Sequence, residues 1–163
     1  MAQRADWSIL INLWSSPMNS AASKSALRAT DVDFTATLED GSPFRASVTE
    51  LKSSVTPGRG DIWMVVATEW ANGRPRTFTI TFSKDRKDAT NEPVTDHDQH
   101  ATVHFNNYED PQNPTLQKAR SGTITYHLNR TSLNFSGSFQ VNMDKADGTG
   151  RFLCSGTYDT ELS

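Results

Sequence analysis

Apolar and polar residues alternate along most of this chain from Asp31 onward. In VDFTATL (residues 32–38) apolar residues occupy every second position, and in TFTITF (residues 77–82) two phenylalanines and an isoleucine alternate with three threonines. This period of two is typical of β-strands that bury one face. Six further segments have strand character: residues 43–51, 61–70, 101–105, 121–128, 135–143 and 152–160.

The eight predicted strands are joined mainly by short turns. Asp40-Gly41 supplies the positive φ that a tight hairpin requires. Residues 83–100 are charged and turn-prone, and we expect them to form the longest loop. Strands do not alternate with helices, so the pattern predicts one all-β, antiparallel domain over residues 31–163. Both a β-sandwich and a closed β-barrel fit this pattern.

Three glycines lie inside the last three predicted strands rather than in turns. Gly122, Gly137 and Gly156 share the parity of the large apolar residues around them, so all three are predicted to point inward. Glycine weakens a strand interior unless it marks a bend, a bulge or the close approach of another group. Two interpretations stay open: aromatic rings that pack over the glycines, or a concave cavity that holds a small ligand. Tyr126 and Tyr158 share this inward face and are candidate ligand contacts.

The first 30 residues are predicted to form a loose extension ahead of the β domain. Residues 19–28 are rich in Ala and Ser and allow one short helix. The apolar run WSILINLW, residues 7–14, is far shorter than the ~20 residues that a membrane-spanning helix needs. Only Arg4 precedes it as a basic residue, which makes it a poor signal peptide. The sequence therefore predicts no membrane span.

Composition narrows the possible functions. The 163 residues carry a net charge of −3 with acidic and basic residues interspersed, which argues against a dedicated nucleic-acid binder. The single cysteine, Cys154, excludes an intramolecular disulfide and fits a reducing compartment. We therefore expect a cytoplasmic location. Cys154 has inward parity, which predicts a buried and inert thiol.

One loop contains the residue types of a transition-metal site. TDHDQHATVHF brings imidazole and carboxylate groups together in sequence, and His97, His100 and Asp98 are the candidate ligands. His104 follows His100 by four residues, but in a strand that spacing is about 13 Å, so these two would not share an ion. We favour the alternative, a solvated polar loop, and expect no cofactor.

No catalytic motif stands out, and two tryptophans point to binding instead. The chain has no nucleophile elbow, P-loop or dinucleotide-binding fingerprint, so we predict that it is not an enzyme. Trp63 and Trp70 lie on opposite parities of one predicted strand. At least one of them is therefore expected on the second face or near the strand end. An exposed tryptophan is a candidate anchor for a partner protein or a sugar.

Short motifs at both ends of the β domain are shared with a group of bacterial proteins. The first is LEDGSPFRAS, and the others are SGTITYHLNRTSLNFSGSFQVNM and CSGTYD. On these motifs, the chain from about residue 31 to 162 resembles small uncharacterised bacterial β-sheet proteins, many of them envelope lipoproteins. The resemblance implies an antiparallel β-fold and a non-enzymatic role, with no activity to transfer. The chain departs from the group in lacking a lipoprotein signal and its lipidation cysteine near the N-terminus.

These observations lead to two hypotheses about function. The first is a non-enzymatic binding module that recognises a protein or a small ligand through loops or a concave sheet face. The second is an immunity-type or structural partner that neutralises or scaffolds another protein. An apolar pocket with a few polar groups would favour the first hypothesis, and a flat acidic patch would favour the second.

Overall fold

The computed structural model describes residues 32–96 and 101–163, and its β unit spans Val32–Ser163. The described residues form ten strands and no helix, which confirms the predicted all-β class. The strands are β1 (Phe34–Thr37), β2 (Pro43–Arg45), β3 (Val48–Thr56), β4 (Gly60–Ala71), β5 (Arg74–Ser83), β6 (Asp88–Pro93), β7 (Thr102–Asn107), β8 (Thr115–Asn129), β9 (Asn134–Asp144) and β10 (Arg151–Glu161).

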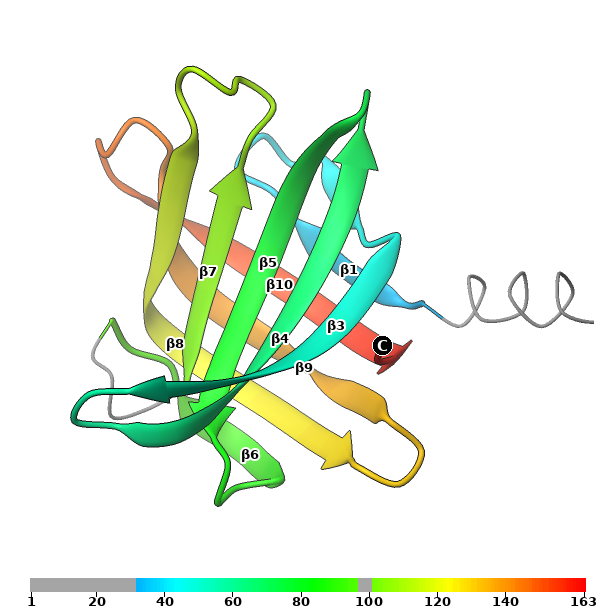
Figure 1. The fold of residues 1–163 in the computed structure, drawn as a ribbon. Helices are drawn as coiled ribbons and strands as arrows, with labels where there is room; N and C mark the ends of the chain where they lie inside the picture. Colours follow the sequence, from blue (N-terminus) through cyan, green and yellow to red (C-terminus); the bar gives the residue numbers. More distant parts are fainter. Residues whose placement is uncertain (1–31, 97–100) are drawn as a thin grey trace, which may run out of the picture. The chain divides into compact units, whose positions relative to one another are not determined.

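All ten strands belong to one curled antiparallel sheet. Its order is β2-β1-β10-β9-β8-β7-β5-β4-β3, with β6 attached to β8 beside this path. The sheet bends so far that β9, β10 and β1 lie behind β7, β5 and β4 (Figure 1). The result is a half-barrel with a concave inner side and a convex outer side.

The strand β8 is the longest and pairs with two strands along one edge. Its first residues pair with β7 and its later residues with β6. The prediction of a continuous loop over residues 83–100 is therefore wrong, because β6 lies within it. The segment escaped notice because it is polar, contains a proline, and pairs irregularly between Ala89 and Glu92.

The single strand predicted over residues 43–51 is divided into β2 and β3. Between them the chain changes its backbone partner. The Ala46 N–H donates to the Phe34 carbonyl of β1 at 3.0 Å, and the Ser47 N–H donates to the Thr68 carbonyl of β4 at 2.7 Å. This short segment is thus hydrogen-bonded to strands from both halves of the sheet order.

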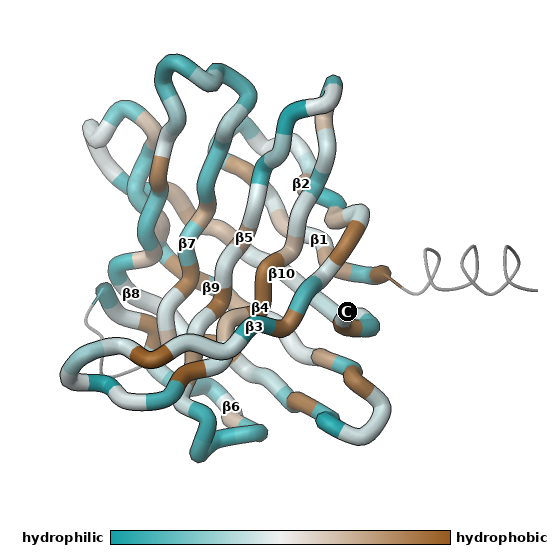
Figure 2. Tube along the Cα trace, in the orientation of Figure 1, coloured by the Kyte–Doolittle hydropathy of each residue, from teal (hydrophilic) through white to brown (hydrophobic). Residues whose placement is uncertain are grey.

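Aromatic rings fill the concave side of the sheet. Tyr158 stacks between Phe34 and Phe135, with ring centroids 5.3 and 4.7 Å away. Phe78 and Phe44 meet edge to face at 4.9 Å. Burying each such side chain stabilises the fold by about 1.5–3 kcal/mol. Hydrophilic residues concentrate in the connections between strands (Figure 2).

The three interior glycines permit this close packing. At Gly122 and Gly137 φ is +127° and +143°, values that strain any residue with a Cβ. A Cβ at Gly137 would also clash with the Thr125 carbonyl of the adjacent strand, and a Cβ at Gly156 would clash with the ring of Phe139. Gly156 therefore accommodates an aromatic ring, which fits the packing interpretation, whereas Gly122 and Gly137 permit the close approach of a neighbouring strand.

The predicted N-terminal extension, residues 1–30, and its short helix over residues 19–28 lie outside the described residues. Within the ranges that the structure describes, no helix has the length and apolar character needed to cross a bilayer. The structure thus bears on the β unit alone.

Candidate binding surfaces

Four residues from neighbouring segments form an exposed apolar surface, the aromatic patch: Trp70, Pro75, Tyr108 and Leu116. Trp70 of β4 pairs with Pro75 of β5, and the Tyr108 N–H donates to the Pro75 carbonyl at 3.1 Å. Leu116 of β8 lies opposite Asn106, two residues before Tyr108. Trp70, Tyr108 and Leu116 are 56%, 42% and 54% exposed. The strand register thus brings together side chains that are far apart in sequence.

The aromatic patch borders an end of the sheet that is rich in carboxylates. Four connections meet at this end, residues 38–42, 72–73, 108–114 and 145–150 (Figure 1). They contain five acidic residues, Glu39, Asp40, Glu109, Asp110 and Asp147, against one basic residue, Lys145. A side-chain hydrogen bond within the same turn is the main cause that lowers the pKa of three of these carboxyl groups: Asp40 with Ser42, Asp110 with Asn113 and Asp147 with Thr149.

An ion-pair network lies beside this end of the core. The Arg76 Nη2 atom lies 2.6 Å from the Glu69 carboxylate of β4, and its Nη1 atom lies 3.3 Å from the Glu109 carboxylate. The side chains of Arg76 and Glu69 are only 15% and 19% exposed. The buried Nε atom of Arg76 has no hydrogen-bond partner among the described residues. Because side chains alternate along β4 and β5, this pair points to the core side of the sheet, opposite to the face that carries Trp70 and Pro75.

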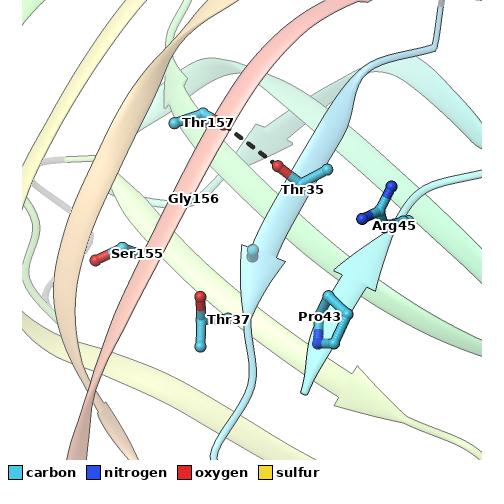
Figure 3. A pocket seen from close by; sticks show the side chains of 8 residues that line it. Thr35, Thr37, Pro43, Arg45, Ser155, Gly156 and Thr157 are labelled. Carbon is cyan, nitrogen blue, oxygen red and sulfur yellow. Dashed lines mark hydrogen bonds between the residues drawn. The ribbon is translucent and has the colours of Figure 1, made fainter. Parts of the chain in front are cut away.

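A groove of about 370 Å³ lies on the outer face of β1, β2 and β10. Its hydroxyl groups come from two strands, Thr35 and Thr37 on β1 and Ser155 and Thr157 on β10, while β2 supplies Pro43 and Arg45 (Figure 3). Ala36 and Gly156 complete the lining. The hydroxyl groups of Thr35 and Thr157 are hydrogen-bonded at 3.3 Å. The groove therefore presents hydroxyl groups and one guanidinium, and its lining contains no carboxylate.

Trp63 lies on the face of β4 opposite to Trp70, as their parities predict. It pairs with Phe82 and packs against the core. The Lys84 ammonium lies 4.6 Å from the Trp63 ring centroid, and the Arg130 guanidinium lies 5.3 Å from it. Such cation–π contacts stabilise the ring where it is. Its role as a ligand contact remains a prediction, and Trp70 is the more exposed of the two.

Tyr126 and Tyr158 are part of the aromatic core. They are 2% and 3% exposed. The Tyr126 hydroxyl contacts Glu92 at 3.1 Å, and the Tyr158 hydroxyl donates to the Thr125 carbonyl at 2.8 Å. Burial is the main cause that raises the pKa of both phenols. The structure thus gives them a packing role, and their predicted contact with a ligand stays a prediction.

The candidate metal ligands His97, Asp98 and His100 lie outside the described residues. Within residues 32–96 and 101–163, no group of three or more His, Cys, Asp or Glu side chains is arranged to hold a metal ion. The metal site therefore stays a prediction from sequence.

One row on the outer face contains the residue types of a hydrolytic triad. The register aligns Asp159, Ser136, His127 and Asp88 across β10, β9, β8 and β6. The Nδ1 atom of His127 contacts the Asp88 carboxylate. These two side chains are 58% and 65% exposed, so they lack the water-excluding surroundings in which such groups stabilise a transition state. We assign no reaction to this row.

Sequence reasoning missed two of the surfaces described above. The only sequence signal of the groove is that Thr35 and Thr37 lie on the polar face of a predicted strand. Tyr108 lies in a polar stretch with no strand pattern, and its proximity to Trp70 depends on the register of three strands.

Comparison of the chain with protein-family models, curated proteins and solved structures finds no match.

Proposed function

We propose that this protein is a non-enzymatic binding module that recognises a partner protein through the aromatic patch. One observation carries the proposal. Among the described residues, six large apolar side chains are exposed, and three of them, Trp70, Tyr108 and Leu116, belong to this patch. Contiguous exposed apolar surface is typical of interaction sites, and Trp and Tyr are enriched among the residues that dominate binding energy.

The surroundings of the patch indicate the chemistry of the partner. The connections at the adjoining end of the sheet carry five carboxylates and one ammonium, and the arginines at the strand ends beside them, Arg74, Arg76 and Arg151, offset part of this negative charge. Asp40, Asp110 and Asp147 carry negative charge at neutral pH, and local hydrogen bonds lower their pKa further. An apolar centre beside negative charge fits a basic protein segment that inserts an apolar anchor. Neutralisation of a basic protein, the immunity-type hypothesis, is one form of this function.

The packed interior of the sheet supports the proposal that the protein binds its partner through the outer surface. We propose that the half-barrel closes into a barrel, because the segment between β2 and β3 is hydrogen-bonded to both β1 and β4. Its interior contains stacked rings such as Tyr126, Phe82 and Phe135 rather than a lining of polar groups. A small barrel filled by side chains binds its partners through its surface. The likeness to bacterial β-sheet proteins fits such a role and remains a hypothesis.

Selection of peptides from a random library tests the proposal. We expect the selected peptides to combine Lys or Arg with apolar residues, and to shift the backbone amide NMR signals of Trp70, Tyr108 and Leu116. Trp70→Ala should weaken their binding by about tenfold or more. Leu153→Ala is the matched control, because Leu153 is 57% exposed on β10 and lies outside the patch. Equal loss in both variants, or peptides that map to another surface, would overturn the proposal.

A further inference from the structure

We propose that the groove on β1, β2 and β10 is a second binding site, for an acidic saccharide. The ligand class joins a carboxylate to a body rich in hydroxyl groups. This inference is independent of the aromatic patch, because it rests on other strands and on other side chains.

The groove has two rows of side chains across its three strands. In the first row Arg45 of β2 is paired with Thr35 of β1, and Thr35 is paired with Thr157 of β10. In the second row Pro43 is paired with Thr37. Ser155, two residues before Thr157 on the same face of β10, completes the lining at that side (Figure 3). A cation thus stands at one side of an array of hydroxyl groups.

These groups match the two parts of an acidic saccharide. A guanidinium binds a carboxylate through two parallel hydrogen bonds, and this is the strongest polar interaction that the groove offers. Threonine and serine hydroxyl groups both donate and accept, which is what sugar hydroxyl groups require. The lining contains no carboxylate that would repel the acid. Its volume of about 370 Å³ lies near the lower end of the range of ~300–1,000 Å³ that is usual for small-molecule sites.

The support beneath the groove is rigid. Gly156 and Ala36 are paired across β10 and β1, and both are buried. The ring of Phe139 lies so close beneath Gly156 that a Cβ there would clash with it. Side chains carried on paired strands over a packed core hold their positions better than side chains on loops. The strand pairing therefore fixes the spacing of the hydroxyl-bearing residues before a ligand binds.

NMR titration of the full chain tests this site with three probes: trigalacturonate, the neutral galactotriose and inorganic phosphate. We expect trigalacturonate to shift the backbone amides of Thr35, Thr37, Ser155 and Thr157 and to bind at least about tenfold more tightly than galactotriose or phosphate. Equal binding of galactotriose would show that Arg45 does not select an acid. Equal binding of phosphate would reduce the groove to a simple anion site. Either result, or shifts confined to another surface, overturns the inference.

Two substitutions assign the binding to the groove. Arg45→Gln should weaken trigalacturonate binding by about tenfold or more, because it removes the charged hydrogen-bond donors. Arg151→Gln is the matched control: it removes an exposed arginine of β10 that does not line the groove, and affinity should be unchanged. Thr37→Val tests the hydroxyl array without a change in charge and should also weaken binding. Unchanged affinity in Arg45→Gln would contradict the inference. Trp70→Ala should leave saccharide binding intact, so this site can be tested separately from the aromatic patch.

Discussion

Gly137 of β9 lies directly opposite Tyr158 of β10, and Tyr126 of β8 lies opposite the same glycine from the other side. A Cβ at Gly137 would meet the backbone of Thr125 and Tyr126, so the glycine permits the close approach of β8 to β9 in a row whose two tyrosines are 2% and 3% exposed. The Tyr158 ring also stacks on Phe135, two residues before the glycine. One glycine thus lies between two tyrosines of the aromatic core.

Gly137→Ala should destabilise the protein by roughly 2–4 kcal/mol. The new Cβ would clash with the Thr125 carbonyl, and the φ of +143° would strain any residue other than glycine. Urea unfolding followed by tryptophan fluorescence measures the change. Gly150→Ala is the control, since a Cβ at Gly150 meets nothing within 4 Å, and we expect no loss there. Similar stability of the two variants would contradict this account of the interior glycines.

Cys154 should resist thiol reagents in the folded protein. Its side chain is fully buried, its Sγ atom contacts the Thr37 carbonyl at 3.2 Å, and burial raises its pKa to about 12. At pH 8 a fluorescent maleimide should therefore label the protein only in denaturant. Rapid labelling of the native protein would show that β10 opens or that the thiol is exposed.

The same thiol should make stability depend on alkaline pH. The pKa in the folded state, about 12, lies above the value of about 8.5 that is usual for an unfolded chain. The folded state therefore holds the proton more tightly, and the contribution of Cys154 is complete below about pH 8.5 and lost as the pH rises toward 12. Unfolding free energies at pH 8 and pH 10.5 should show a smaller difference between the wild type and Cys154→Ala at the higher pH. A constant difference would contradict this prediction.

Glu69→Gln should cost about 1–3 kcal/mol of stability. The change removes the carboxylate that lies 2.6 Å from Arg76, whose side chain is only 15% exposed, and leaves this poorly solvated cation with the more distant Glu109 carboxylate at 3.3 Å. Lys52→Gln supplies the comparison, since the Lys52–Glu50 pair is exposed and 4.0 Å apart, and we expect a change below about 0.5 kcal/mol. Thermal and urea unfolding measure both. Equal effects would show that burial does not strengthen the Arg76 pair.

Alternation in the sequence predicts strands well where one face is covered: in β10 the residues Cys154, Tyr158 and Thr160 are buried and those between them are exposed or glycine. TFTITF becomes the middle of β5, but Thr79 and Thr81 are buried along with the phenylalanines and the isoleucine, so both faces are covered there. The strand β6 could not be found in this way, since it is polar, its burial does not alternate, and it is a strand only through its pairing with β8. The division of β2 from β3 was equally hidden, because it reflects a change of hydrogen-bond partner and not of residue type.

The two binding surfaces depend on register, which the alternation of a single strand does not specify. The sequence indicates that Trp63 and Trp70 differ in direction, but it does not place Pro75 and Tyr108 beside Trp70. In the groove, Thr35 and Thr157 are hydrogen-bonded although they are 122 residues apart. Contacts over such separations follow from the strand order, and only the folded sheet reveals them.

The pairing of β1 with β10 also affects how the protein is made. During synthesis the strand that covers one edge of β1 is translated more than a hundred residues after β1 itself. Until then the apolar face of β1 and its free edge are exposed in a nascent chain, and both are known causes of aggregation. Folding can be completed only after β10 has emerged, so the unpaired edge of β1 persists throughout the synthesis of the strands between them.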